Sequence, residues 1–300
     1  MAKISLKSSN AVAETLLIAL HARVLEAQRP APLVRDDQAP AVAAQIDYDF
    51  SRFALRDHDQ TTTIMRLREF DRRAIAFLAR NPQAVVVHIG CGLDTRFDRI
   101  DNGRVTWYDL DLPEVIELRR RLIGENDRCT AIGCSAFDSR WLDLIGPHPG
   151  RPFLFLAEGV LPYFDPGQVR ELVLTLLQRF PGCELVFDAL TPFMIGLHNL
   201  ELRLSRVGAR LRWGLRRERD LEAWGECIRL LEAWYYFDRP EPRLGATRLM
   251  RFLPFFARGV GVFHYRLGAA DPHAGQLPDP GDGGSESFAR SPGDGRVQAR

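Results

Sequence analysis

Short apolar segments alternate with helical patterns from Pro82 to Leu267, and this alternation constrains the fold more than any other feature of the sequence. It is typical of βαβ units, in which crossover helices join parallel strands. Five strands are predicted, over residues 84–89, 105–110, 129–133, 153–157 and 184–189. Helices are predicted between them, over residues 113–124, 139–145 and 166–179. We therefore expect an α/β fold whose mostly parallel sheet carries helices on both faces.

The C-terminal third adds two predicted strands, over residues 229–237 and 260–267, with a helix near 246–256 between them. These would complete a seven-stranded sheet. A basic stretch over about 192–227 predicts a helical lid, although a solvent-facing helix explains its arginines equally well. Residues 268–300 are rich in glycine, proline, serine and aspartate, and we expect a disordered tail because so few apolar side chains cannot offset the ordering entropy.

Two amphipathic patterns precede the sheet, over residues 10–28 and 61–80. They predict an N-terminal helical extension over residues 1–82, followed by the main domain over 83–267. The apolar stretch at 16–20 is too short to span a bilayer. We expect neither a signal peptide nor a transmembrane helix, and a cytoplasmic protein.

Charge and cysteine content exclude several classes of partner. The formal net charge is +1, so no global field would attract nucleic acid or an anionic membrane. The five cysteines are scattered, without a Cys/His cluster at zinc-ligand spacing. We expect a reducing compartment, no metal, no nucleic acid and no membrane partner; the sequence does not indicate the number of subunits.

A glycine loop follows the first strand of the sheet, where Gly90, Cys91 and Gly92 come directly after residues 84–89. In open parallel sheets the carboxyl end of the first strand lies near the switch point where ligands bind, and glycine lets the backbone approach them. A GxG sequence also occurs in ordinary tight turns. The loop therefore predicts a cofactor site only together with other residues.

The second strand supplies such residues, because Asp109 and Asp111 follow Gly90 by 19 and 21 positions. A carboxylate about 20 residues beyond the loop binds ribose hydroxyls in nucleoside-binding folds. The alternative is that one of the two acids caps the helix that begins at Pro113. Asp111 is the better candidate for the ribose.

The loop does not match a dinucleotide-binding fingerprint. A third glycine is expected for NAD, but Thr95 occupies that position, and Asp94 stands where a diphosphate anion would lie. A cationic sulfonium cofactor without phosphate tolerates these residues. The sequence thus favours S-adenosylmethionine over NAD.

These residues also resemble the leucine carboxyl methyltransferase family, in its branch of bacterial tetracenomycin-type polyketide O-methyltransferases. The matching segments run from about residue 8 to Gly268 and include VAETLLIALHARVLEA, MRLREFD, HIGCGLDTR, WYDLDLPEVIELRR, SAFDSRW and LAEGVLPYF. The C-terminal third matches loosely. The resemblance departs from the family pattern at Cys91, where alanine is usual, and at His88, where asparagine is usual.

The resemblance implies a class I methyltransferase, Rossmann-like fold with the N-terminal extension covering the cofactor site. It also implies that S-adenosylmethionine is held by Arg66, Gly90, Gly92, Asp111, Asp138 and Glu158. From spacing alone, Arg66 is equally well explained as a helix arginine paired with Glu69 or Asp71. Glu158 ends a predicted buried strand, where a carboxylate is costly unless a helix N-terminus or the cofactor ammonium satisfies it.

Methyl transfer from a sulfonium is an in-line displacement, in which the protein mainly holds the acceptor oxygen, methyl carbon and sulfur in line. The sequence therefore identifies no catalytic residue. A carboxylate acceptor is already ionised near neutral pH, whereas a phenol or alcohol needs a base, for which His21 and His198 are weak candidates. Tyr163 is a weak candidate for lining the acceptor site, and an aromatic there is more often packing.

We expect an O-methyltransferase that acts on a small molecule, plausible acceptors being a carboxylate or hydroxyl of a polyketide-like metabolite. Three alternatives remain at this point. They are methylation of a protein's C-terminal carboxylate, a nucleotide-binding oxidoreductase, and a binding module without catalysis.

Overall fold

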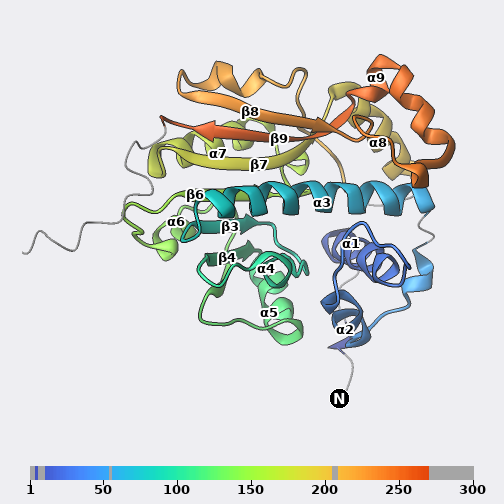
Figure 1. Cartoon of the computed structure of the whole chain (residues 1–300), viewed down its shortest axis with the longest axis horizontal. Helices are drawn as coiled ribbons and strands as arrows, with labels where there is room; N and C mark the ends of the chain where they lie inside the picture. Colours follow the sequence, from blue (N-terminus) through green and yellow to red (C-terminus); the bar gives the residue numbers. More distant parts are fainter. Residues whose placement is uncertain (1–3, 6–10, 54–55, 205–208, 270–300) are drawn as a thin grey trace, which may run out of the picture.

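Seven strands form one mixed sheet in the order β5-β4-β3-β6-β7-β9-β8 (Figure 1). The computed structural model describes residues 4–5, 11–53, 56–204 and 209–269. The strands are β3 (Val85–Ile89), β4 (Thr106–Asp111), β5 (Cys129–Gly133), β6 (Phe153–Ala157), β7 (Cys183–Leu190), β8 (Ile228–Tyr235) and β9 (Val260–Leu267). The first five pair in parallel, and β9 lies antiparallel between β7 and β8. The predicted α/β class and seven strands are confirmed, with strand ends displaced by no more than two residues.

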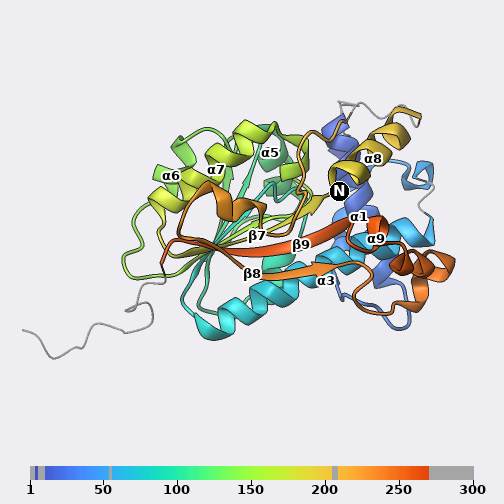
Figure 2. The same cartoon turned by 90° about the horizontal axis from the view of Figure 1, so that it is seen from above.

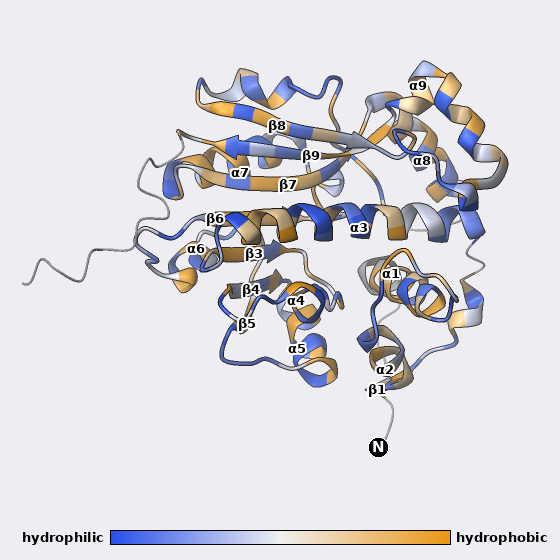
Figure 3. Ribbon diagram, viewed as in Figure 1, coloured by the Kyte–Doolittle hydropathy of each residue, from blue (hydrophilic) through white to orange (hydrophobic). Residues whose placement is uncertain are grey.

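Helices cover both faces of the sheet because its central strands are apolar on both sides. In β3, Val85, Val87 and Ile89 pack on one face, and Val86 packs on the other. The face with Val86 is covered by α3 (Asp57–Arg80), α4 (Arg96–Ile100) and α5 (Pro113–Leu122), and the opposite face by α6 (Arg140–Ile145) and α7 (Pro166–Arg179). Figure 2 shows α3 and α7 on opposite sides of the sheet, and Figure 3 shows the apolar character of β3 and β7.

The N-terminal elements lie beside the carboxyl ends of β3 and β4 (Figure 1). They are β1 (Ile4–Ser5), α1 (Ala11–Ala27), α2 (Gln38–Ala44), β2 (Ile46–Asp47) and η1 (Phe50–Arg52). Leu17 and Leu20 of α1 are buried in a cluster with Leu93, which belongs to the glycine loop. The helix predicted over 10–28 is confirmed, whereas α2 and the small β1–β2 sheet had no clear periodicity to predict them.

The prediction of a long helix after Pro192 is wrong beyond residue 204. α8 (Pro192–Leu204) is followed, after a gap at 205–208 in the described residues, by extended chain and then by η3 (Asp220–Trp224). Leu211, Trp213 and Leu215 are buried at alternate positions, which is the period of extended chain. The amides of Arg212 and Trp213 donate to the Pro162 carbonyl, so a distant loop supplies the bonds that a helix would have made internally.

The helix predicted near 246–256 is also wrong as a single element. The structure has a 3-10 helix, η4 (Pro242–Phe252), and a short helix, α9 (Pro254–Ala257). Gly245 breaks η4 with φ of 56° and ψ of −131°, and Pro254 begins the next turn because it has no amide to donate. Residues 270–300 of the predicted tail lie outside the described residues. Within the described ranges, no helix is long and apolar enough to cross a membrane.

Candidate functional site

The glycine loop after β3 has a backbone that other residues would not adopt without strain. Gly90 and Gly92 have φ of 66° and 53°, in the left-handed region. A Cβ on Gly90 would lie 2.2 Å from Cγ2 of Val160, and one on Gly92 would lie 2.6 Å from Cδ2 of Leu16. The loop is therefore a close-packed backbone turn, with the Val160 side chain against Gly90 and the Leu16 side chain of α1 against Gly92.

Asp109 and Asp111, on the same strand, are bonded to different parts of the protein. The carboxylate of Asp111 accepts from the amides of Gly92 at 2.8 Å and Leu112 at 2.7 Å. The carboxylate of Asp109 is buried and accepts from Arg119 at 2.5 Å and from the indole of Trp107 at 2.8 Å. Asp109 thus neutralises a core arginine, while Asp111 holds the glycine loop. Since an ionised carboxylate has about four lone-pair sites, Asp111 can accept two further bonds.

Arg66, on α3, lies at the carboxyl ends of β6 and β7. Its Nε donates to Oε1 of Glu158 at 3.0 Å, and its Nη1 donates to Oδ2 of Asp188 at 3.2 Å. The alternative that Arg66 pairs with Glu69 or Asp71 is wrong, because those two acids bind other arginines. Among the described residues, Glu158 and Asp188 accept from Nε and Nη1 of Arg66 and not from Nη2, and the guanidinium also lies beside the Tyr236 hydroxyl.

Glu158 is satisfied by two arginines rather than by a helix N-terminus. Besides Arg66, it accepts from Nη2 of Arg96 at 2.5 Å. Burial alone would raise the pKa of Glu158, but the charges of Arg96 and Arg66 hold it below its usual value. In contrast, burial raises the pKa of Asp188 even though Arg66 opposes the change. The pKa values of the two carboxyls bonded to Arg66 are therefore shifted in opposite directions.

A buried network connects this cluster with the N-terminal extension. Arg96 also donates to Asp71 at 2.7 Å and lies 3.0 Å from Nε2 of His88. Arg99 forms ion pairs with three acids, Asp71 at 2.9 Å, Asp94 at 2.8 Å and Asp36 at 3.1 Å. Arg23 pairs with Asp36 at 2.7 Å. Since Arg23 belongs to α1, the extension is tied to the glycine loop by ion pairs as well as by apolar packing.

Asp138 lies after β5 and is only partly buried. Its carboxylate accepts from the amide of Arg140 at 3.0 Å and from Nε of Arg140 at 2.8 Å, and these bonds lower its pKa to about 2. No contact joins Asp138 to Arg66, Glu158 or Asp111 among the described residues. Its assignment to the cofactor stays a prediction.

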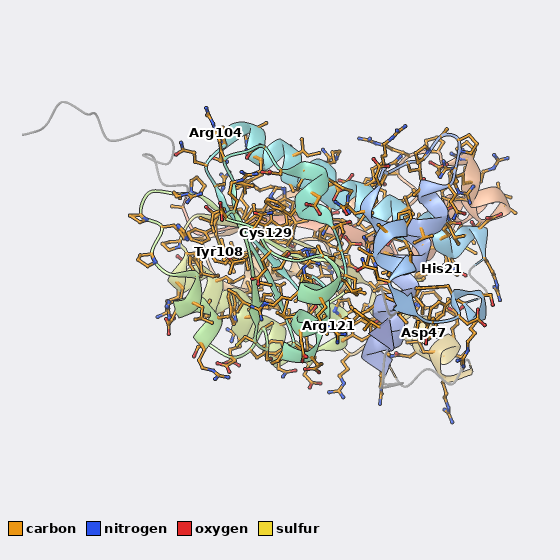
Figure 4. All side chains as sticks on the ribbon, turned by 90° about the horizontal axis from the view of Figure 1, so that it is seen from below. His21, Asp47, Arg104, Tyr108, Arg121 and Cys129 are labelled. Atoms are coloured by element: carbon orange, nitrogen blue, oxygen red, sulfur yellow. The ribbon has the colours of Figure 1, made fainter. Side chains whose placement is uncertain are left out.

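The three weak catalytic candidates lie in different surroundings. Tyr163 is mostly buried in η2 (Leu161–Tyr163); burial raises its pKa, and the charges of Arg66 and Asp188 act on it. His21 stacks on Phe50 with 5.5 Å between ring centroids, and burial lowers its pKa. Figure 4 shows His21 on α1, far from Tyr108. His198 is 49% exposed on α8, 3.9 Å from Glu201. In the described part of the chain neither histidine bonds to the Arg66 cluster.

The arrangement fits a nucleoside with an amino-acid end. The glycine loop offers backbone without side chains of its own at Gly90 and Gly92, Asp111 offers acceptors for hydroxyls, and Arg66 with Glu158 offers one cation and one anion side by side. A Cβ on Gly159 would lie 3.4 Å from Nη2 of Arg66, so this glycine keeps space beside the guanidinium. Such a set of groups recognises a zwitterion and a ribose without any phosphate.

Sequence reasoning missed Asp188 and the supporting role of Arg96. Asp188 stands in the fully buried strand β7, and a carboxylate in such a strand is a signal that a cation lies beside it. Arg96 was read only as part of a family segment. Its complete burial had no signal in the sequence, because arginine is normally exposed.

The model of the family described as leucine carboxyl methyltransferase matches residues 16–176, more than half of the chain. The tetracenomycin polyketide synthesis O-methyltransferase TcmP of Streptomyces glaucescens is 38% identical over 76% of this chain and 84% of its own length. The S-adenosyl-L-methionine-dependent methyltransferase dpfgK of Gibberella zeae is 32% identical over 70% of this chain and 77% of its own length.

Solved structures agree on the fold. A crystal structure of a candidate methyltransferase from Thermobifida fusca has a TM-score of 0.52 at 17% identity, covering 83% of this chain and 94% of its own. A DUF574 family protein from Streptomyces avermitilis has a TM-score of 0.51 at 16% identity, covering 83% and 96%. At these identities the likeness concerns the fold alone.

Proposed function

Because this chain belongs to the leucine carboxyl methyltransferase family and is an S-adenosylmethionine-dependent methyltransferase, we propose that it methylates an oxygen atom of a small molecule. The proposed acceptor is a carboxylate of a polyketide-like metabolite. The polyketide assignment rests on the relative named for tetracenomycin synthesis. The observation that carries the proposal is the meeting of Arg66, Glu158, Asp111 and the glycine loop at one end of the sheet.

Each group of the site has a proposed role in binding the cofactor. Arg66 takes the carboxylate of the methionine part through Nη2, and Glu158 takes its ammonium group. Asp111 accepts from the ribose hydroxyls, while Gly90 and Gly92 allow the backbone to approach. Asp138 binds near the adenine, which requires that it exchange part of its contact with Arg140.

Bound S-adenosylmethionine supplies a methyl carbon attached to a positively charged sulfur. The protein then has to hold the acceptor oxygen in line with that carbon and exclude water. A carboxylate acceptor needs no general base, since it is ionised at neutral pH. This agrees with a site in which neither His21 nor His198 bonds to Arg66, Glu158 or Asp188 among the described residues.

Two measurements test the proposal. Calorimetric titration should show binding of S-adenosylmethionine, weakened about tenfold in Arg66→Lys, because lysine keeps the charge but not the fork of donors. Arg179→Lys, an exposed pair with Asp143, is the matched control and should bind as the wild type does. Absence of binding by the folded wild-type protein would contradict the cofactor assignment.

The second measurement identifies the acceptor oxygen. Carboxylic-acid and phenolic polyketides are incubated with the enzyme and methyl-labelled cofactor, and the products are treated with mild base. Label released from an extractable small molecule indicates a methyl ester, as proposed. Label that resists base indicates an ether, and label on protein would transfer the assignment to a protein carboxylate.

A further inference from the structure

A cavity opens at the carboxyl end of β7, and its lining does not include Arg66, Asp111 or Glu158. Its volume is about 510 Å³, which suits a small organic molecule. Ala189 of β7 and Tyr235 of β8 line this cavity. Their chain neighbours are Asp188, which bonds to Arg66, and Tyr236, whose pKa is affected by the charge of Arg66. The cavity and the Arg66–Asp188 pair therefore share the carboxyl end of β7, and the side chains of Asp188 and Ala189 point to opposite faces of the sheet because successive strand residues do so.

The polar wall of the cavity is positively charged. It contains Arg216, Arg217 and Arg258 against a single acid, Glu218. Glu218 is already bonded, accepting from the Tyr235 hydroxyl at 3.1 Å and lying 3.4 Å from Nη1 of Arg258. Among the described residues, neither Arg216 nor Arg217 has an ion pair. The wall thus carries more positive charge than its own acid balances.

The apolar wall is aromatic and open to solvent. Phe193 on α8 and Phe255 on α9 are 53% and 74% exposed, with 5.9 Å between their ring centroids. Leu215 and Phe263 form the deeper apolar lining. Figure 3 shows hydrophobic residues on both α8 and α9. Large exposed aromatics around a cavity are typical of a surface that a ligand covers.

We propose that this cavity binds the end of the methyl acceptor remote from the reacting oxygen, and that it selects a planar aromatic group carrying an anionic substituent. This inference rests on the proposed function and specifies the chemical class of the methyl acceptor. The aromatic part packs against the exposed rings of Phe193 and Phe255, and the anion is attracted by Arg216 and Arg217. Binding energy from a remote part of a substrate is a means of positioning the reacting part.

The test measures binding of anthracene-2-carboxylate and of its neutral carboxamide by calorimetry, without S-adenosylmethionine. The wild type should bind the carboxylate more tightly than the carboxamide. The double variant Arg216→Gln/Arg217→Gln should lose this preference, with about fivefold weaker carboxylate binding, the loss expected for exposed ion pairs. Phe255→Ser should weaken both probes alike, because it removes only apolar contact.

The control is Arg219→Gln, since Arg219 is exposed, bonded to Glu222 and outside the cavity wall. It should bind both probes as the wild type does, and all variants should keep the wild-type affinity for S-adenosylmethionine. Equal binding of the two probes by the wild type, no binding of either, or no effect of the arginine and Phe255 variants overturns the proposal. Because cofactor affinity is measured separately, failure of this inference is distinct from failure of the proposed function.

Discussion

The guanidinium of Arg96 is bonded to the carboxylate of Glu158, with Nη2 and Oε2 2.5 Å apart, although 62 positions separate the two residues. Arg96 has no solvent exposure, and its other bonds reach Asp71 and His88. One side chain thereby fixes the start of α4, the end of β6 and helix α3 relative to one another. Arg96 thus holds Glu158 in place, which makes Arg96 a positioning residue for the proposed cofactor site.

Arg96→Lys should destabilise the protein by about 3 kcal/mol, because lysine cannot satisfy Asp71 and Glu158 together and leaves buried charge uncompensated. The free energy of unfolding is measured by urea denaturation, and cofactor affinity by calorimetry on the folded variant. Arg179→Lys, on the surface, is the control. Wild-type stability in Arg96→Lys would show that the network contributes little.

Gly90→Ala should abolish measurable cofactor binding and lower stability, since the new Cβ would lie 2.2 Å from Val160 and the residue has φ of 66°. Gly103→Ala separates the two causes, because its φ is 77° but nothing lies within 4 Å of the added Cβ. That variant should lose only about 1 kcal/mol from its backbone conformation and should bind the cofactor normally. Equal effects at the two glycines would contradict the role of close packing at Gly90.

Asp111→Asn should mainly weaken cofactor binding, whereas Asp109→Asn should mainly lower the stability of the fold, although the two acids are only two positions apart. Asp111→Asn should weaken cofactor binding about tenfold, as expected for bonds to a charged acceptor, with a smaller loss of stability. Asp109→Asn leaves Arg119 buried without its counter-charge and should cost about 3 kcal/mol in the free energy of unfolding. Calorimetry and urea denaturation on both variants check the pair, and a reversed pattern would exchange the two assignments.

Acid should destabilise the protein partly through Asp109. Burial alone would raise the pKa of Asp109, but the charge of Arg119 lowers it to about 2. A carboxyl whose pKa is lower in the folded protein than in the unfolded chain stabilises the fold at pH values above its usual pKa. For Asp109 this stabilisation is on the order of 2 kcal/mol, and it is lost as pH falls from about 4 to about 2. Urea denaturation between pH 5 and pH 2 should therefore show a smaller gap between wild type and Asp109→Asn at the acid end. A constant gap would mean that Arg119 does not lower the pKa of Asp109.

The sequence by itself determined the sheet and the position of the glycine loop after β3. Apolar runs such as residues 129–133 and 153–157 predicted strands that the structure has at the same bounds, because side-chain alternation and turn residues act over a few positions. Gly90, Gly92 and the acids of β4 were found for the same reason, since their spacing follows from one strand-loop-strand unit. The family resemblance added Arg66 and Glu158, which no local pattern connects.

Only the tertiary structure decided what these charged residues do. Whether Arg66 pairs with Asp71 or with Glu158 and Asp188 depends on which strand ends lie beside α3, and residues 92 and 122 positions away cannot be located by periodicity. The segment after α8 is extended for a similar reason, because the Pro162 carbonyl accepts its amides. Local propensity fixes elements where backbone bonds are internal, whereas bonds and charges satisfied by distant parts of the chain are fixed only when the chain has folded.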